Sequence, residues 1–292
     1  MIKLNKVCFS YDGEHPVLVD FCMEIPDGGA IAVMGASGSG KTTLLRILLG
    51  LEKPNSGEIF GLNNKRFAVV FQEDRLLQHR TARQNVEIPL IGTQIEKTNV
   101  HKIAGTALRD VELNGFEDFS VRELSGGMRQ RAMVAMGISA GPRIILADEP
   151  TKGLDERRIR MVADALNQLK EETLLCVTHD MKFAKAVGDK ISVMYAAQQL
   201  EYGTAAQVLE HPLHPYTQDM IRAMPENGMK CEGTGFALSH TEYEAETGCR
   251  YRKRCAQCRE ICKKVPPVIE FDGHRVRCWK YAADNGKTDQ TI

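Results

Sequence analysis

Residues 35–42 carry the spacing Gly-x-x-x-x-Gly-Lys-Thr, whose residue types could bind phosphate. Glycines let the backbone come close enough to an anion for successive N–H groups to point at its oxygens. Lys41 has the reach for the outer phosphates of a nucleotide, and the Thr42 hydroxyl can bind Mg²⁺. The residues expected to contact the nucleotide in this loop are Gly35, Ser37, Gly38, Gly40, Lys41, Thr42 and Thr43.

Two carboxylates and a histidine follow two apolar runs further along the chain. Asp148 and Glu149 end the run that starts at Ile144, and His179 follows the run 173–178. Because the carboxyl ends of parallel strands meet at one edge of a sheet, we expect the three side chains at the same edge. Buried acids are costly unless something uses them. We therefore expect Asp148 to hold Mg²⁺ and Glu149 to polarise an attacking water.

A second candidate anion site lies at Ser125, Gly126 and Gly127. Ser125 is a good helix N-cap, and the two glycines leave backbone N–H groups bare where the helix begins. The segment has no lysine and no preceding strand. Taken alone, it is more typical of an ordinary capped helix than of an anion site.

Strands and helices alternate around these groups. A short apolar strand at 31–33 precedes the glycine loop, and a helix-forming segment at 44–49 follows it. The alternation in 2–9 and 17–25 indicates two paired strands. The run 67–71 indicates another strand, and the pattern from there to about residue 140 is mainly helical. The sequence therefore predicts an α/β fold with a parallel core sheet.

The composition is that of an ordinary globular protein, with 43% apolar and 26% charged residues and a net charge of +0. Such a balance does not favour nucleic acid as a partner. No apolar run approaches the length of a membrane span, and the first residues lack the apolar core of a signal peptide. We therefore expect the chain in the cytosol.

Six of the nine cysteines lie in the last quarter of the chain. In a reducing compartment this crowding favours a metal site over disulfides. We expect a linker at 226–248 and a small Cys-rich C-terminal module at 249–292. The six are Cys231, Cys249, Cys255, Cys258, Cys262 and Cys278.

Taken in order, these motifs resemble the ATPase subunit of ABC transporters, over a domain at 1–225. The resemblance implies a P-loop NTPase fold with a RecA-like parallel core sheet, an antiparallel β subdomain, and a helical subdomain at about 73–140. It assigns adenine stacking to Tyr11 and the γ-phosphate contact to His179. It implies that Gln72 senses both Mg²⁺ and the transport partner, and that Asp155 belongs to the D-loop of this family.

The same resemblance implies how such an ATPase works. Two ATPase domains, identical or different, pair head to tail. Each ATP then lies between the glycine loop of one and Ser125, Gly126 and Gly127 of the other. Hydrolysis opens the pair. The implied partners are integral membrane permease subunits and, indirectly, an extracytoplasmic substrate-binding protein, with no nucleic acid. The implied location is peripheral, at the cytoplasmic face of the cell membrane.

The tail narrows the resemblance. Residues 202–217 resemble the stretch that follows the cassette in ATPases of peptide and nickel importers. Cys249, Cys255, Cys262 and Cys278 resemble the cysteine module of that subfamily, which in some members holds a [4Fe–4S] cluster. Four thiolates also suit zinc, and the Cys255-x-x-Cys258 spacing is common in zinc sites, so Cys258 stays a candidate ligand.

The expected substrate is therefore an oligopeptide, nickel or a metal chelate. Part of the cassette favours another class, because residues 72–77 and 152–155 look more like importers of nitrate or sulfonate. A third alternative is a soluble ABC ATPase in which a metal cluster has a regulatory role.

Overall fold

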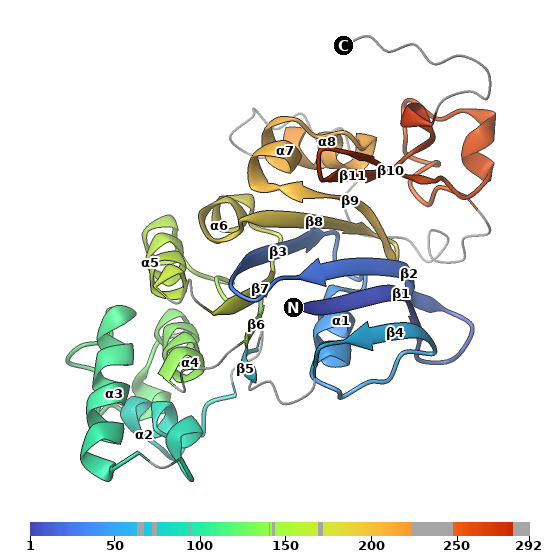
Figure 1. Ribbon diagram of the computed structural model, residues 1–292. Coiled ribbons are helices and arrows are strands. Elements are labelled where there is room, and N and C mark those ends of the chain that lie inside the picture. The colour runs from blue at the N-terminus through green and yellow to red at the C-terminus, as the bar shows by residue number, and fades with distance from the viewer. Residues whose placement is uncertain are drawn as a thin grey trace.

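The computed structural model describes residues 1–62, 67–71, 75–93, 95–139, 141, 144–168, 172–223 and 248–282. In this part of the chain the strands form one sheet of eight strands and one of three (Figure 1). The larger sheet has the order β10-β11-β9-β8-β3-β7-β6-β5. Its strands are β3 (Gly29–Gly35), β5 (Phe67–Val70), β6 (Ile144–Asp148), β7 (Thr173–Val177), β8 (Lys190–Tyr195), β9 (Gln198–Thr204), β10 (Val268–Phe271) and β11 (His274–Arg277).

The strands from β8 to β5 run parallel and confirm the predicted parallel core. β6 and β7 are buried along their whole length, as expected for strands covered on both faces. In their register Asp148 lies opposite Val177. The chain therefore leaves β6 at Glu149 and β7 just before His179 at the same edge, beside the loop that follows β3.

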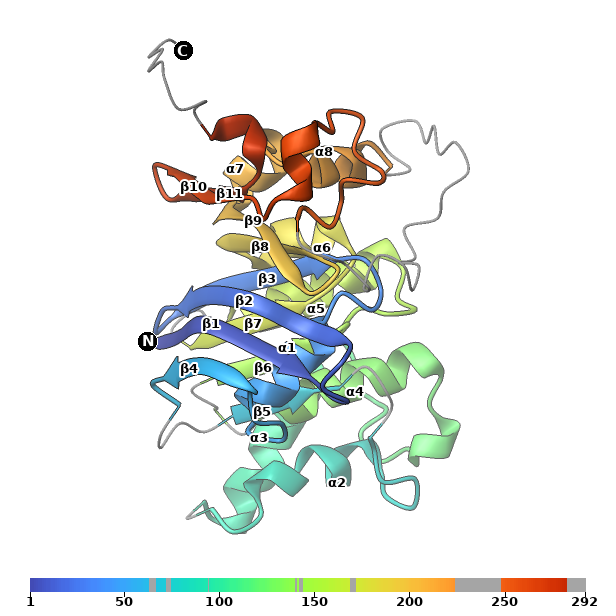
Figure 2. The ribbon, with the colours of Figure 1, turned by 90° about the vertical axis from the view of Figure 1, so that its right-hand side faces the viewer.

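The smaller sheet is the predicted antiparallel subdomain. It has the order β2-β1-β4, and both pairings are antiparallel. Its apolar side chains pack with those of α1 (Lys41–Leu48) and the core strands, as in the contact group that contains Leu4, Phe21, Leu44 and Leu146. The helix that follows the glycine loop is thus held between the two sheets (Figure 2). The three strands are β1 (Ile2–Ser10), β2 (Pro16–Ile25) and β4 (Ser56–Phe60).

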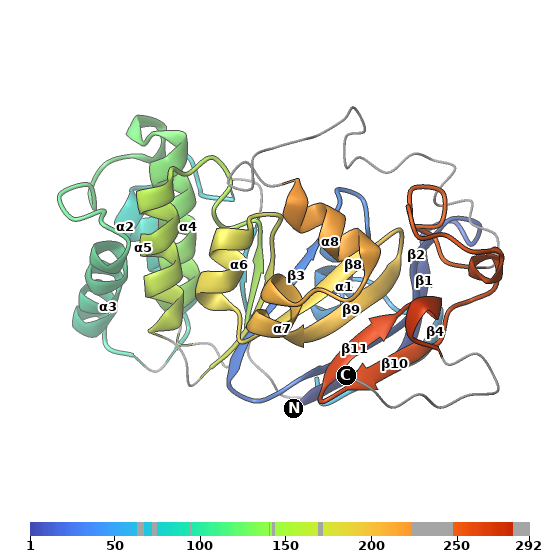
Figure 3. The same cartoon turned by 90° about the horizontal axis from the view of Figure 1, so that it is seen from above.

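Helices cover the other side of the core. Figure 3 shows α2, α3, α4 and α5 gathered at the end of the molecule opposite β1, β2 and β4. They share one apolar core with the ends of β5 and β6, which includes Val86, Leu108, Val134 and Ile145. No helix in the described ranges is both long and apolar enough to cross a membrane. The segments are α2 (Ala82–Val86), η1 (Ile88–Leu90), α3 (Lys97–Asp110), η2 (Val121–Glu123), α4 (Gly126–Ser139), α5 (Glu156–Asn167) and α6 (Met181–Val187).

The Cys-rich segment is built onto the larger sheet. β11 pairs antiparallel with β9, and β10 continues the sheet beyond it (Figure 1). Because an open strand edge leaves backbone groups unpaired, this pairing satisfies the outer edge of β9. The boundaries expected near residues 225 and 249 stay predictions. The remaining segments are α7 (Ala205–Glu210), α8 (Pro215–Arg222), η4 (Glu260–Lys263) and η5 (Trp279–Tyr281).

One buried carboxylate joins this C-terminal region to the sheet. Glu201, on β9, is 1% exposed. Its oxygens accept the backbone N–H groups of Leu213 at 2.8 Å and His214 at 2.9 Å. The Nε2 atom of His274, on β11, lies 2.7 Å from the same carboxylate. Since a buried charge is tolerated only when its hydrogen bonds are satisfied, these three partners fix the turn before α8 against β9 and β11.

Candidate functional site

The predicted glycine loop joins β3 to α1. Gly35 and Gly40 have φ angles of +147° and +101°. A Cβ at Gly35 would lie 2.1 Å from the carbonyl oxygen of Met194, and one at Gly40 would lie 2.3 Å from that of Val17. Both positions therefore require glycine, and the loop wraps tightly because neighbouring backbone lies directly against it.

Lys41 is held inside this loop. It is 8% exposed, and its Nζ donates to the carbonyl oxygens of Gly35 at 2.9 Å and Ala36 at 2.8 Å. Burial lowers the pKa of the Lys41 ammonium, while Glu149 and Asp148 act in the opposite direction by favouring its charged form. An incoming phosphate thus meets a fixed cation at the base of the loop.

The loop opens into a cavity of about 440 Å³ that brings the predicted groups together. All seven loop residues expected to contact the nucleotide line it, and so do both carboxylates and the histidine. Three further lining residues, Val17, Lys152 and Val177, were not predicted. The lining residues are Val17, Gly35, Ser37, Gly38, Gly40, Lys41, Thr42, Thr43, Asp148, Glu149, Lys152, Val177 and His179.

Asp148 and Thr42 offer oxygen ligands inside this cavity. Asp148 is 6% exposed. Burial raises the pKa of its carboxyl, and a hydrogen bond from Thr42 acts in the opposite direction. Its Oδ1 has no hydrogen-bond partner among the described residues. A buried, unpaired carboxylate oxygen beside a hydroxyl fits Mg²⁺, which binds few protein ligands and keeps waters and phosphates as the others.

Glu149 and His179 form a pair at the end of their strands. His179 Nδ1 lies 2.8 Å from Glu149 Oε2. The hydrogen bond to Glu149 raises the pKa of His179. Glu149 has a φ of +49°, rare for a residue with a side chain, and its N–H donates to the carbonyl of Val177 at 2.9 Å. Backbone strain at a cavity residue is a feature that recurs at functional sites.

Tyr11 lies beside the loop. Its hydroxyl is 3.2 Å from Thr43 Oγ1, and its ring makes an edge contact with Phe9 at 4.8 Å between centroids. The side chain is 58% exposed. An exposed ring held next to the phosphate loop is compatible with adenine stacking, which stays a prediction.

The second candidate anion site lies apart from this cavity. Ser125 Oγ accepts the N–H of Met128 at 3.3 Å, and a Cβ on Gly126 would meet open space. Ser125, Gly126 and Gly127 are not among the described residues that line the cavity. Asp155 caps α5, since its carboxylate accepts the N–H of Arg158 at 2.9 Å. Gln72 lies outside the described residues.

Tyr216 is a contact of the phosphate loop that the sequence did not indicate. Its hydroxyl accepts the N–H of Ala36 at 2.9 Å. The residue is 1% exposed, and burial raises its pKa to about 12. Its ring packs against Tyr195 at 4.6 Å and Tyr251 at 5.3 Å between centroids. The two bonded residues are 180 positions apart, so no local sequence signal could have shown the contact.

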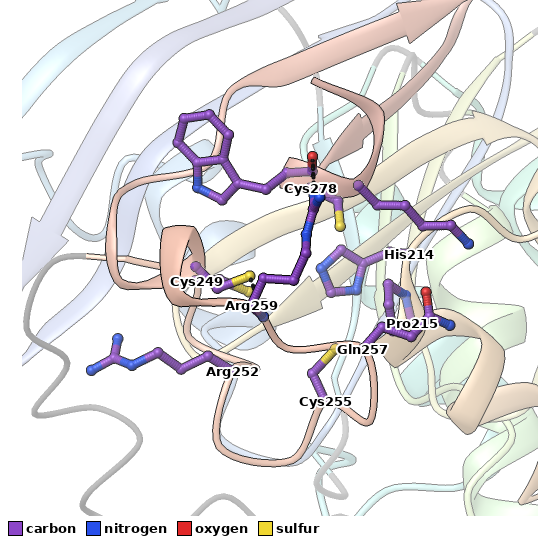
Figure 4. Close-up of a pocket in the computed structure, with 11 residues that line it drawn as sticks. His214, Pro215, Cys249, Arg252, Cys255, Gln257, Arg259 and Cys278 are labelled. Atoms are coloured by element: carbon purple, nitrogen blue, oxygen red, sulfur yellow. Dashed lines mark hydrogen bonds between the residues drawn. The ribbon is translucent and has the colours of Figure 1, made fainter. Parts of the chain in front are cut away.

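Four cysteines line a second cavity, of about 240 Å³ (Figure 4). They are the four of the predicted set, whereas Cys258 is exposed and is not in the lining. Cys231 lies outside the described residues. The lining also holds three cationic side chains and a buried histidine. The lining residues are His214, Pro215, Cys249, Arg252, Cys255, Gln257, Arg259, Cys262, Cys278, Trp279 and Lys280.

The backbone brings the first and third of these cysteines together. The N–H of Cys249 donates to the carbonyl of Cys262 at 2.9 Å. A Cβ on Gly248 would lie 2.7 Å from the same carbonyl oxygen, so a larger residue there would push the two segments apart. Burial raises the pKa of Cys249 to about 12 and also raises those of Cys255 and Cys278. These thiols are therefore protonated at neutral pH unless a bound metal replaces the proton.

A single metal ion finds no ready site here. Within the described residues, no group of three or more His, Cys, Asp or Glu side chains is arranged to hold one. The thiols instead surround a cavity and share it with cationic side chains. Four thiols are donors of a kind that suits either zinc or an iron–sulfur cluster.

Comparisons with known proteins agree with the nucleotide site. The family model described as "ABC transporter" matches residues 18–152, and the one described as "Oligopeptide/dipeptide transporter, C-terminal region" matches residues 200–262. The oligopeptide transport ATP-binding protein OppD of Escherichia coli (strain K12) is 29% identical over 96% of this chain and 92% of its own. The sulfate/thiosulfate import ATP-binding protein CysA of Synechocystis is 33% identical over 77% of this chain and 68% of its own.

A solved structure agrees with the fold. The chain is similar to the dimeric structure of MJ0796, a bacterial ABC transporter cassette. The TM-score is 0.65 and the sequence identity 31%, over 70% of this chain and 99% of that one.

The Tyr216 contact predicts a weaker nucleotide site when its hydroxyl is removed. In Tyr216→Phe the buried N–H of Ala36 loses its acceptor. Because a net hydrogen bond is worth about 0.5–1.5 kcal/mol, ATP affinity should fall about two- to tenfold by calorimetry. Tyr251→Phe is the matched control, since it loses a hydroxyl bonded to Asp219 in the same ring cluster but far along the chain from the loop. Equal ATP affinity in both variants would contradict the role of Tyr216.

Proposed function

This chain belongs to the ABC transporter family, and on that premise we propose that it powers the uptake of oligopeptides or dipeptides through separate membrane subunits. As a member it is an ATP-binding subunit of importer type that hydrolyses ATP to drive transport. The observation that favours peptides is the match of residues 200–262 to the oligopeptide/dipeptide C-terminal region. The relative named for oligopeptide transport matches 96% of the chain, whereas the one named for sulfate matches 77%. Nickel and metal chelates stay predictions.

In the proposed reaction the chain's own residues bind ATP and orient and activate the attacking water. Lys41 and the loop amides bind the outer phosphates of ATP. Positive groups at this position stabilise the negative charge that develops on the phosphates in the transition state. Asp148 and Thr42 would hold Mg²⁺, which neutralises phosphate charge when bound. Glu149 orients and polarises the attacking water. His179, which pairs with Glu149 through its Nδ1 atom, would contact the γ-phosphate.

The reaction needs a second cassette, identical or different. Ser125, Gly126 and Gly127 present a capped helix start away from the cavity of their own chain, which supports a role toward the nucleotide of a partner. Asp155 lies at the start of the next helix, α5. Gln72 would sense both Mg²⁺ and the permease subunits. The further proposed partners are the permease subunits at the cytoplasmic face of the membrane and, through them, an extracytoplasmic binding protein.

The C-terminal cavity supports a cofactor proposal. Four thiols and three cationic side chains around about 240 Å³ suit an anionic, thiolate-bound [4Fe–4S] cluster, with zinc as the alternative. When bound, such a group supplies electron transfer or a structural cross-link.

The cofactor proposal predicts that iron and acid-labile sulfide accompany the chain when it is purified without air. Cys262→Ser should lose most of both, because it removes a thiolate from the cavity. Cys258→Ser is the matched control and should keep both, since its thiol is exposed. Iron-free wild-type protein would overturn the cluster, and zinc in its place would support the alternative.

A transport class other than peptides also has an observation in its favour. The relative named for sulfate/thiosulfate import is 33% identical, which is higher than the 29% of the oligopeptide relative. This is the small-anion alternative.

Uptake by cells separates the two substrate classes. Deleting the gene should abolish uptake of a labelled di- or tripeptide and leave labelled sulfate uptake unchanged. Wild-type protein should restore peptide uptake, and Glu149→Gln should not, because the water-polarising carboxylate is gone. Glu156→Gln, an exposed change on α5, is the control and should restore it. Loss of sulfate uptake alone would favour the anion class, and loss of neither would contradict both.

A further inference from the structure

His214 lies between the cysteine cavity and Tyr216, the residue that is hydrogen-bonded to the phosphate loop. It is the N-cap residue of α8 and lines the cavity with the four cysteines (Figure 4). Building on the cofactor proposed above, we propose that the Nε2–H of His214 donates a hydrogen bond to a sulfur atom of the thiolate-bound group in this cavity. His214 would then be a donor to the group and not one of its ligands.

The hydrogen bonds of the ring assign its proton. The backbone N–H of Tyr216 donates to His214 Nδ1 at 3.0 Å, so the lone pair of Nδ1 is in use. The ring is 1% exposed and has no carboxylate hydrogen-bonded to it, and an Nδ1 atom that accepts a hydrogen bond carries no proton. A neutral imidazole carries one proton, and here it must be on Nε2. A protonated Nε2 has no lone pair for a metal, which excludes it as a ligand.

The Nε2 proton of His214 lacks a hydrogen-bond acceptor within the part of the chain that the structure describes, and the Nε2 atom is buried. Leaving a buried donor unpaired costs about 1–3 kcal/mol, so such a group calls for an explanation. Figure 4 shows the His214 ring among the sulfur atoms, between Cys255 and Cys278. The cavity that the ring lines also holds four cysteine sulfur atoms, which become stronger acceptors when a bound group makes them anionic thiolates.

The ring is also fixed in place. The backbone N–H of His214 donates to Glu201 Oε2 at 2.9 Å, and Pro215 follows at the first position of α8. The ring makes an edge contact with Tyr251 at 6.1 Å between centroids. A donor held this firmly favours the more negative state of a sulfur-bound group, and hydrogen bonds to sulfur are one of the means by which proteins set its reduction potential.

The test compares His214→Asn with the wild-type chain, both purified without air. The Asn side-chain oxygen can still accept the N–H of Tyr216 and cap α8, but its short side chain brings no donor to the cavity. His211→Asn, the same change at an exposed site, is the control. Iron and sulfide content, midpoint potential and the rate of iron removal by a chelator are measured, with ATP affinity as the check on folding.

We expect His214→Asn to keep the metal content and ATP affinity of the wild type, to have a lower midpoint potential, and to lose iron about tenfold faster. His214→Gln, whose amide can reach the cavity as a donor, should lie closer to the wild type. If zinc is the bound metal, we expect its release to be fastest from His214→Asn, slower from His214→Gln and slowest from the wild type. In the wild type, coupling of an exchangeable histidine proton to the reduced group would support the donor without any variant.

Two outcomes would overturn the proposal, and they differ. If the wild-type chain holds no metal, the cofactor proposal fails and the donor with it. If the metal content is full but His214→Asn has the potential and the release rate of His211→Asn, the cofactor stands and the donor alone is wrong.

Discussion

The pairing of Glu149 with His179 is the interaction on which the nucleotide site depends. It exists because β6 and β7 are parallel neighbours, so their carboxyl ends meet, and because each chain segment turns sharply just beyond its strand. The positive φ of Glu149 and its bond to Val177 hold the carboxylate at that edge. Lys41 lies close enough for its charge to be felt at both Asp148 and Glu149, so the cation of the loop and the acids of the sheet form one electrostatic unit.

The C-terminal region is part of the same framework. His214 Nδ1 accepts the N–H of Tyr216, and the Tyr216 hydroxyl accepts the N–H of Ala36. The wall of the cysteine cavity and the backbone of the phosphate loop are therefore joined by two successive hydrogen bonds through one residue. Glu201 also holds this wall in place, because its carboxylate accepts the backbone N–H of His214. The chemistry of the two cavities differs, and Tyr216 connects their walls.

The sequence was sufficient where the structure is set locally. The loop from Gly35 to Thr43 could be predicted because glycine, lysine and threonine at fixed spacing admit few other conformations. Asp148, Glu149 and His179 followed from two buried strands and the geometry of parallel sheets. The four cavity cysteines followed from the resemblance of the tail, whereas only the structure shows that Cys258 is exposed and outside the cavity lining.

Other parts depend on contacts between distant positions. Tyr216 meets Ala36 across 180 positions, and Glu201 joins three segments that no spacing connects. The addition of β10 and β11 to the sheet depends on which strand edge is open, which is a property of the folded core.

A titration of His179 tests the central pairing most directly. Histidine NMR of the nucleotide-free chain, assigned with a His179→Gln variant, gives the midpoint of this ring. Because the bond to Glu149 raises the pKa of His179 above its ordinary value of 6.5, the protonated and paired form should persist past that pH. It should be lost only as the pH rises through the higher midpoint. In Glu149→Gln the midpoint should fall back toward 6.5. A midpoint at or below the ordinary value that does not respond to Glu149→Gln would contradict the account.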